Sequence, residues 1–222
     1  MKEISVFDVI GPNMIGPSSS HTAGALRIAL LAGKLTRHKI VKAEFTLYGS
    51  FAKTYKGHGT DRALLAGILG FATDDPRIKS SFEYAEKSGL NYSFILNTTE
   101  KELHPNTVDI AITDDTDAIT TVRGVSTGGG NCKLERINNV TVSLSGNYTT
   151  LLMRQLDKPG IVAYITKILS DFGINIAFMR MYRESKGEAA YTIIEVDGEV
   201  PSDVISKIEE NKLIESAMLI QI

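Results

Sequence analysis

The chain has 222 residues, of which 43% are hydrophobic and 23% charged, and this ordinary globular composition excludes disordered, collagen-like and low-complexity proteins. The formal net charge of −2, with no long run of one sign, argues against broad electrostatic attraction to nucleic acid or to an anionic membrane. No apolar stretch reaches the ~20 residues of a membrane span, and the N-terminus carries acids where a secretory signal would be basic and then apolar. We therefore expect a cytoplasmic protein.

The first expected domain, residues 1–146, has the pattern of a mixed α/β domain whose strand order the sequence leaves open. Apolar spacing predicts helices over 22–35, 61–69 and 80–88. Alternating or clustered apolar residues predict strands over 41–47, 92–96, 108–113, 118–123, 133–137 and 141–145. The glycine-rich segment 128–131 is expected to be a turn, and because no helix follows it, it makes a poor phosphate loop.

The second expected domain, residues 147–222, has the order β-α-β-β-α-β of a ferredoxin-like unit. Strands are expected over 149–156, 174–179, 189–196 and 213–222, and helices over 161–172 and 201–211. The turn Asp157–Gly160 leads into the first of these helices. The predicted fold class of the whole chain is therefore α+β.

Cys132 is the one cysteine in the sequence. A single thiol forms no internal disulfide and cannot supply the four thiolates of a structural zinc site or of an iron–sulfur cluster. We therefore expect no metal site in this chain, and metal chemistry would need thiolates from another polypeptide.

The segment Gly11–Pro17 contains two Gly-Pro dipeptides and runs directly into Ser18-Ser19-Ser20-His21-Thr22. The prolines keep the chain from becoming helical until the hydroxyl cluster, where a helix then begins. A helix start offers unpaired N–H groups and partial positive charge, which suit a carboxylate or a phosphate. One serine acting as an N-cap would need no ligand, but four hydroxyls beside a histidine favour a binding site.

His58 lies between two glycines, just before the next helix start. Glycines let a ligand approach the backbone closely, and an imidazole is suited to act as a general base near neutral pH. A loop histidine without a role is the alternative. In the second domain, the turn Asp157–Gly160 and Asn175 are suited to bind a small amino acid, and the alternative is a packing module that only dimerises.

The segments Gly11–Gly24 (GPNMIGPSSSHTAG) and Gly57–Arg62 (GHGTDR) resemble signatures of iron–sulfur-dependent L-serine dehydratase, in the separate beta chain of the two-chain bacterial form. Leu156–Ala163 and Gly173–Ile176 resemble an ACT domain, an amino-acid-sensing βαββαβ module. The N-terminal domain is also similar to the allosteric substrate-binding domain of some phosphoglycerate dehydrogenases.

The resemblance implies an L-serine ammonia-lyase that makes pyruvate and ammonia in amino-acid catabolism and gluconeogenesis. It implies a 4Fe-4S cluster held by cysteines of the alpha chain, with one open iron accepting the hydroxyl while a base removes the Cα proton. His58 would be the base and His21 would orient or stabilise charge, although the residues do not distinguish the two. The substrate carboxylate would be held by four hydroxyl side chains: Ser18, Ser19, Ser20 and Thr22.

The implied partners are the alpha chain, without which this chain would be inactive, L-serine as substrate and candidate effector, and a second copy of the chain. The implied regulatory contacts are Asp157, Gly160 and Asn175, and we expect Gly160→Val to clash at the helix start. Two other classes of function stay open. One is a purely regulatory serine-binding protein without catalytic residues, and the other is a scaffold that only dimerises its partner.

Overall fold

A computed structural model describes residues 13–220, so Gly11 and Pro12 of the first signature lie outside the described residues. The chain divides into two compact units between Asn138 and Asn139. Strand β6 (Val140–Leu144) falls in the second unit, so this division precedes the boundary expected at residue 146. Among the described residues, no helix is both long and apolar enough to span a bilayer. The mixed α/β architecture with separate sheets confirms the predicted fold class.

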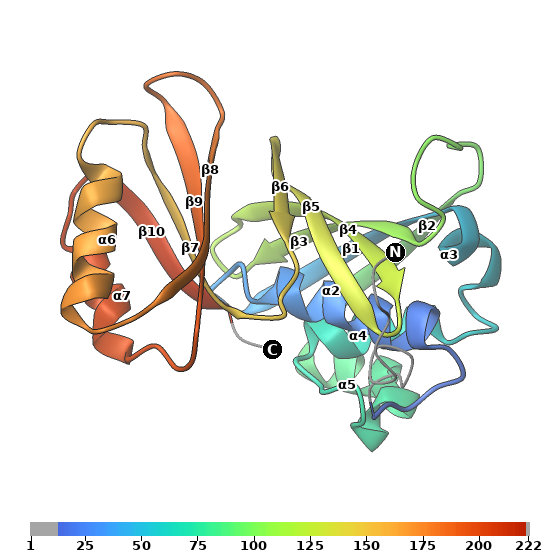
Figure 1. The fold of residues 1–222 in the computed structure, drawn as a ribbon. Helices are drawn as coiled ribbons and strands as arrows, with labels where there is room; N and C mark the ends of the chain where they lie inside the picture. Colours follow the sequence, from blue (N-terminus) through green and yellow to red (C-terminus); the bar gives the residue numbers. More distant parts are fainter. Residues whose placement is uncertain (1–12, 221–222) are drawn as a thin grey trace, which may run out of the picture. The chain divides into compact units, whose positions relative to one another are not determined.

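From residue 13 onward, the first unit combines four α-helices with one mixed sheet, which Figure 1 shows. The helices are α2 (Gly24–Gly33), α3 (Gly49–Thr54), α4 (Thr60–Ile68) and α5 (Ser81–Ser88), with a π-helical turn η1 (Ser19–Ala23) and a 3₁₀ turn η2 (Pro76–Ser80). The strands are β1 (Ile40–Tyr48), β2 (Asn91–Asn97), β3 (Thr107–Asp114), β4 (Ile119–Gly128) and β5 (Asn131–Ile137). They lie in the order β2-β1-β3-β4-β5, and β1 pairs parallel with β2 and antiparallel with β3.

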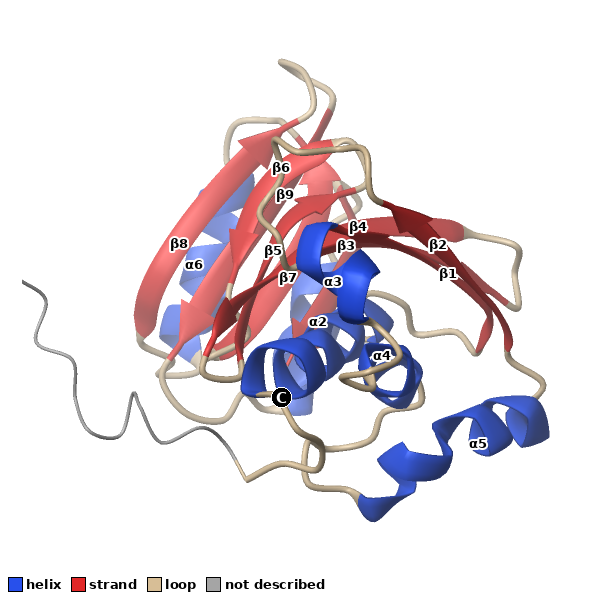
Figure 2. Cartoon of the chain, turned by 90° about the vertical axis from the view of Figure 1, so that its right-hand side faces the viewer, coloured by secondary structure: helices blue, strands red, loops and turns tan. Residues whose placement is uncertain are grey.

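Strand β1 shows how the alternating pattern sets the core. Ala43, Phe45 and Leu47 are fully buried, as the period of two predicts. Helices α2 and α4 lie on one side of the sheet (Figure 2), and α2 packs against β3, β4 and β5. Each predicted helix and strand of this unit is present, with ends shifted by a few residues.

Helix α3 was not expected, because the sequence suggests only that β1 ends at Gly49 and Ser50. Gly49 has a φ of +51°, and a Cβ there would lie 2.7 Å from the Pro105 Cα. At Gly49 the chain leaves β1 and passes close to Pro105. The Pro105 carbonyl oxygen accepts from the Ser50 and Phe51 N–H groups at 2.7 and 3.2 Å. A contact with a residue so distant in sequence leaves no local signal.

Helices α2 and α4 approach each other closely at Gly67. A Cβ at this position would lie 2.3 Å from the Leu26 carbonyl oxygen and 2.7 Å from the Ala29 Cβ. The absence of a side chain therefore sets the spacing of the two helices that follow the two predicted histidine loops.

We predict that Gly67→Ala lowers the free energy of unfolding by about 1–3 kcal/mol, because the new methyl group overpacks the helix interface. Urea denaturation followed by circular dichroism measures it. Gly33→Ala is the matched control, since the nearest atom to its Cβ would be the Ile40 Cδ1, at an ordinary contact distance of 3.6 Å. Equal stability of the Gly67 and Gly33 variants would contradict the prediction.

The second unit has the predicted β-α-β-β-α-β order, preceded by β6. Its elements are β7 (Thr149–Leu156), α6 (Ile161–Asp171), β8 (Ile176–Arg183), β9 (Ala189–Val196), α7 (Ser202–Glu209) and β10 (Ile214–Ile220). The antiparallel sheet order β10-β7-β9-β8 is the ferredoxin-like arrangement. Helices α6 and α7 pack side by side on one face of this sheet (Figure 1). The core between them contains Leu151, Ile165, Leu169, Ile194 and Ile208.

Candidate functional site

The first unit brings the two predicted histidines together. The ring centroids of His21 and His58 lie 4.7 Å apart, with an angle of 73° between the ring planes. His21 belongs to η1, and His58 precedes α4, so two helix starts converge as the sequence suggested.

Ser18 is the N-cap of η1, which is the structural explanation considered for a single hydroxyl. Its Oγ accepts from the His21 backbone N–H at 3.1 Å and also lies 3.3 Å from the His21 Nδ1. The turn that follows is π-helical, with the Gly24 N–H donating to the Ser19 carbonyl, and such turns are frequent at functional sites. The cap and the wide turn together fix the His21 side chain.

Thr22 ties the two histidine loops together. Its hydroxyl donates to the His58 carbonyl oxygen at 3.0 Å, and its side chain is only 2% exposed. Gly16, with a φ of +120°, packs so closely over Thr22 that a Cβ there would lie 2.5 Å from the Thr22 Cγ2. Burial makes this hydrogen bond costly to break, so it holds His58 beside His21.

His58 is held by its backbone, while one of its ring nitrogens has no partner. The His58 N–H donates to the Thr54 carbonyl at 3.0 Å, and Gly59 then takes a left-handed φ of +66°. The His58 Nδ1 is buried and makes no hydrogen bond within the described part of the chain. A buried polar atom without a partner is unusual in a folded protein, and this marks His58 as a candidate functional residue.

A cavity of about 190 Å³ lies beside His58. His58 and Thr22 line it, together with three cationic residues, Lys56, Arg62 and Lys79, and none of its lining residues is acidic. An anionic ligand, such as an amino-acid carboxylate, fits this charge.

His21 is held between two hydroxyls from different segments. Its Nε2 lies 2.9 Å from the Ser50 Oγ in α3, and its ring packs edge-on to Phe51 at 5.4 Å. Burial, followed by the charge of His58, lowers the pKa of His21 below its ordinary 6.5. The folded ring therefore protonates at lower pH than the unfolded one, and this contribution to stability is lost as the pH falls below about 6.5.

Sequence reasoning missed Ser50 and gave the glycine turn no role. Ser50 follows a strand with no motif around it, so nothing local marks it. The turn Gly128–Asn131 joins β4 to β5 as expected, but it also lies near the serine cluster, since a Cβ on Gly128 would be 3.9 Å from the Ser20 Oγ. Positive φ values at Gly128, Gly129 and Gly130 allow this turn.

We predict that His58→Ala raises the pKa of His21 toward 6.5, because the substitution removes a neighbouring imidazole and opens the site to water. An NMR titration of the imidazole signals measures the shift in the isolated chain. His38→Ala, which removes an exposed imidazole near Asp115, is the control and should leave the His21 titration unchanged. A His21 midpoint that is the same in the wild type and the His58 variant would contradict the assigned contact.

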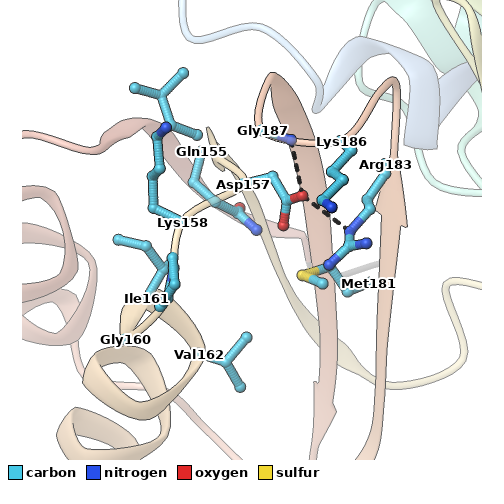
Figure 3. Close-up of a pocket in the computed structure, with 12 residues that line it drawn as sticks. Gln155, Asp157, Lys158, Gly160, Ile161, Val162, Met181, Arg183, Lys186 and Gly187 are labelled. Carbon is cyan, nitrogen blue, oxygen red and sulfur yellow. Dashed lines mark hydrogen bonds and ion pairs between the residues drawn. The ribbon is translucent and has the colours of Figure 1, made fainter.

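A second cavity, of about 420 Å³, lies in the second unit between the β7–α6 turn and the β8–β9 hairpin (Figure 3). Asp157 and Gly160 line it, and the Asp157 Oδ2 accepts from Arg183 Nε at 3.0 Å and from the Gly187 N–H at 3.1 Å. Lys158 and Lys186 add further positive charge to the lining. Asn175 is absent from this lining, and its side chain donates to Asp197 at 2.7 Å.

Gly160 is required for a different reason from the clash that we expected. No atom lies within 4 Å of a Cβ at this position, so there is room for a side chain. The backbone, however, has a φ of +91°, which disfavours any residue with a Cβ. The expectation of a steric clash was wrong, and the constraint at the start of α6 is conformational.

Comparison with known proteins assigns the chain to a family. The family model of the serine dehydratase beta chain matches residues 5–91, which include both histidine loops, and the ACT domain model matches residues 149–212. The L-serine dehydratase beta chain of Peptoniphilus asaccharolyticus is 41% identical over 197 residues, or 89% of each chain. A probable L-serine dehydratase beta chain of Bacillus subtilis (strain 168) is 40% identical over 210 residues, or 95% of this chain and 94% of the relative. This chain belongs to the L-serine dehydratase beta chain family.

The predicted resemblance is thus confirmed, and the second unit contains an ACT domain. A D-3-phosphoglycerate dehydrogenase of Methanocaldococcus jannaschii is 26% identical over 120 residues, which cover 54% of this chain and 22% of that protein.

Residues 13–220 offer no set of the donors that an iron–sulfur cluster needs. Cys132 is 2% exposed, and burial raises the pKa of its thiol to about 11, so it is protonated at neutral pH. Within residues 13–220, no group of three or more His, Cys, Asp and Glu side chains is placed to hold a metal ion. The described residues therefore do not fit a cluster.

Proposed function

We propose that this beta chain supplies substrate-binding and proton-transfer residues to an L-serine ammonia-lyase that becomes active with an alpha chain. The observation that carries the proposal is the contact between His21 and His58, 4.7 Å apart beside a cavity lined by three cations. A serine zwitterion presents to such a site a carboxylate that the cations attract and a Cα proton that a histidine removes.

His58 is the favoured general base of the pair. Both ring nitrogens of His21 already lie within hydrogen-bond distance of serine hydroxyls, whereas the His58 Nδ1 has no partner among the described residues. The lowered pKa of His21 favours its neutral form, so that its ring carries no positive charge beside the base. Loss of the Cα proton and of the β-hydroxyl gives aminoacrylate, which hydrolyses to pyruvate and ammonia.

The hydroxyl groups divide into two kinds in this proposal. Ser18 and Thr22 position the histidines, because the structure commits their side chains to His21 and His58. Ser19 and Ser20 lie in the same turn, and in this proposal they bind the substrate carboxylate together with the helix start.

We assign the 4Fe-4S cluster, as the group that accepts the departing hydroxyl, to cysteines of the alpha chain. This assignment agrees with the family of the chain and with the buried, protonated Cys132. The active site would then be completed only where the two chains meet, in the cytoplasm.

We predict that His58→Ala lowers kcat by about 10²–10⁴-fold in the reconstituted enzyme, which is the usual contribution of a general base. The two chains are combined anaerobically with iron and sulfide, and pyruvate formation is measured. His38→Ala is the control for an exposed histidine outside the site and should keep wild-type activity. Wild-type kcat in a folded His58 variant would remove the catalytic role.

The same assay separates the two alternative functions. A purely regulatory serine-binding protein would leave the alpha chain fully active alone, whereas the lyase proposal requires both chains. A scaffold that only dimerises its partner would tolerate alanine at Ser19 and Ser20, with effects on assembly alone. In the lyase proposal these substitutions raise the KM for serine instead.

We further propose that the ACT cavity is a regulatory serine site. The amine of a bound amino acid would lie near Asp157, and its carboxylate near the start of α6 and the cations that line the cavity. Asn175 would take part only after leaving Asp197.

We predict that Gly160→Val weakens serine binding to the isolated chain by about tenfold or more, because the strained turn rearranges the cavity. Isothermal titration calorimetry measures this loss, and turnover at saturating serine should change much less. Gly173→Val is the matched control, since Gly173 also has a positive φ (+68°) with open space around it but lies outside the cavity. Equal loss in both variants would argue against a ligand at this turn.

A further inference from the structure

We propose that Ser50 is a positioning residue for the lyase reaction, which holds the His21 ring through its Nε2 so that the ring faces His58 in a fixed orientation. This inference rests on the proposed function. Its basis is the 2.9 Å contact between the Ser50 Oγ and the His21 Nε2, made by a segment that no motif marks.

The backbone fixes the place of the Ser50 hydroxyl. Ser50 stands in the first turn of α3, where its N–H donates to the Pro105 carbonyl at 2.7 Å and its own carbonyl accepts from the Thr54 hydroxyl at 2.9 Å. Gly49 passes Pro105 so closely that a side chain there would overlap the Pro105 backbone. The hydroxyl is therefore presented by an anchored turn rather than by a free loop.

The His21 ring has a contact on each of its edges. Ser18 lies 3.3 Å from Nδ1 and Ser50 lies 2.9 Å from Nε2, while Phe51 and His58 pack against the ring. A neutral imidazole has one donor and one acceptor nitrogen, and a serine hydroxyl serves either one. The two serines thus hold the ring in place in both tautomers, and Ser50 provides the shorter of the two contacts.

Loss of the Ser50 hydroxyl leaves Nε2 without this partner in a partly buried site. The ring then turns toward water or toward another hydrogen-bond partner, and its orientation to His58 is lost. Because the effect falls on the geometry of proton transfer and not on the carboxylate, kcat should fall while the KM for serine changes little.

The test compares Ser50→Ala, Ser50→Cys and Ser50→Thr in the reconstituted two-chain enzyme. We expect a fall in kcat of about 10- to 100-fold for alanine and cysteine, and recovery for threonine, which restores a hydroxyl. The cysteine variant keeps the side-chain size, so it tests the hydrogen bond if the alanine variant is unstable. Lys53→Ala is the control for α3, because it changes an exposed side chain of the same helix.

A second measurement does not depend on turnover. In the isolated chain, the ¹⁵N shifts of the His21 ring report which nitrogen carries the proton, and Ser50→Ala should change them while Lys53→Ala should not. Wild-type kcat together with unchanged ¹⁵N shifts in folded Ser50 variants would overturn the proposal. If the two wild-type chains together make no pyruvate, the proposed function fails. The ¹⁵N shifts alone then decide whether Ser50 holds the His21 ring.

Discussion

The hydrogen bond from the Thr22 hydroxyl to the His58 carbonyl is the contact on which the account of this chain depends. It joins two loops that are 36 residues apart in sequence and is made by a side chain that is 2% exposed. Two glycines make it sterically feasible. Gly16 leaves room for the Thr22 side chain. Gly67 lets α2 and α4, the helices that follow the two loops, pack so closely that a Cβ at this position would overlap the backbone of α2. The imidazoles of His21 and His58 lie in contact because these contacts hold the two helix starts close together.

The charges around this pair agree with chemistry on an amino acid. Burial keeps His21 neutral near pH 7, the His58 Nδ1 has no protein partner in the described chain, and the cavity beside it is lined by cations without an acidic residue. Such a lining favours an anionic group beside His58. The buried thiol of Cys132 supplies no cluster ligand. In the proposed function, this chain would transfer the proton and the cluster would be held by the partner chain.

Much of the fold could be predicted from periodicity. The alternation of Ala43, Phe45 and Leu47 marks β1, and the order of the second unit follows from its apolar spacing and turn residues. Helix α3 could not be predicted, because the Pro105 carbonyl that anchors it lies about 55 residues further along the chain.

The site was predicted in part. The convergence of His21 and His58 follows from two motifs at helix starts, but the roles of individual hydroxyls do not, since a capping serine and a ligand-binding serine look alike in sequence. Thr22 belongs to the binding motif yet bonds to protein backbone, and Asn175 bonds to Asp197 instead of lining the cavity. Ser50 was missed because the contact that gives it a role comes from tertiary structure.

The central claim, that the two imidazoles lie in contact in the folded chain, is tested most directly by nuclear Overhauser spectroscopy on protein with ¹³C-labelled histidine. The ring centroids 4.7 Å apart predict cross-peaks between the ring protons of His21 and His58, and these should disappear in Thr22→Val if the hydroxyl bond holds the loops together. Well-resolved ring signals of the folded wild-type chain with no cross-peak between these two residues would contradict the account.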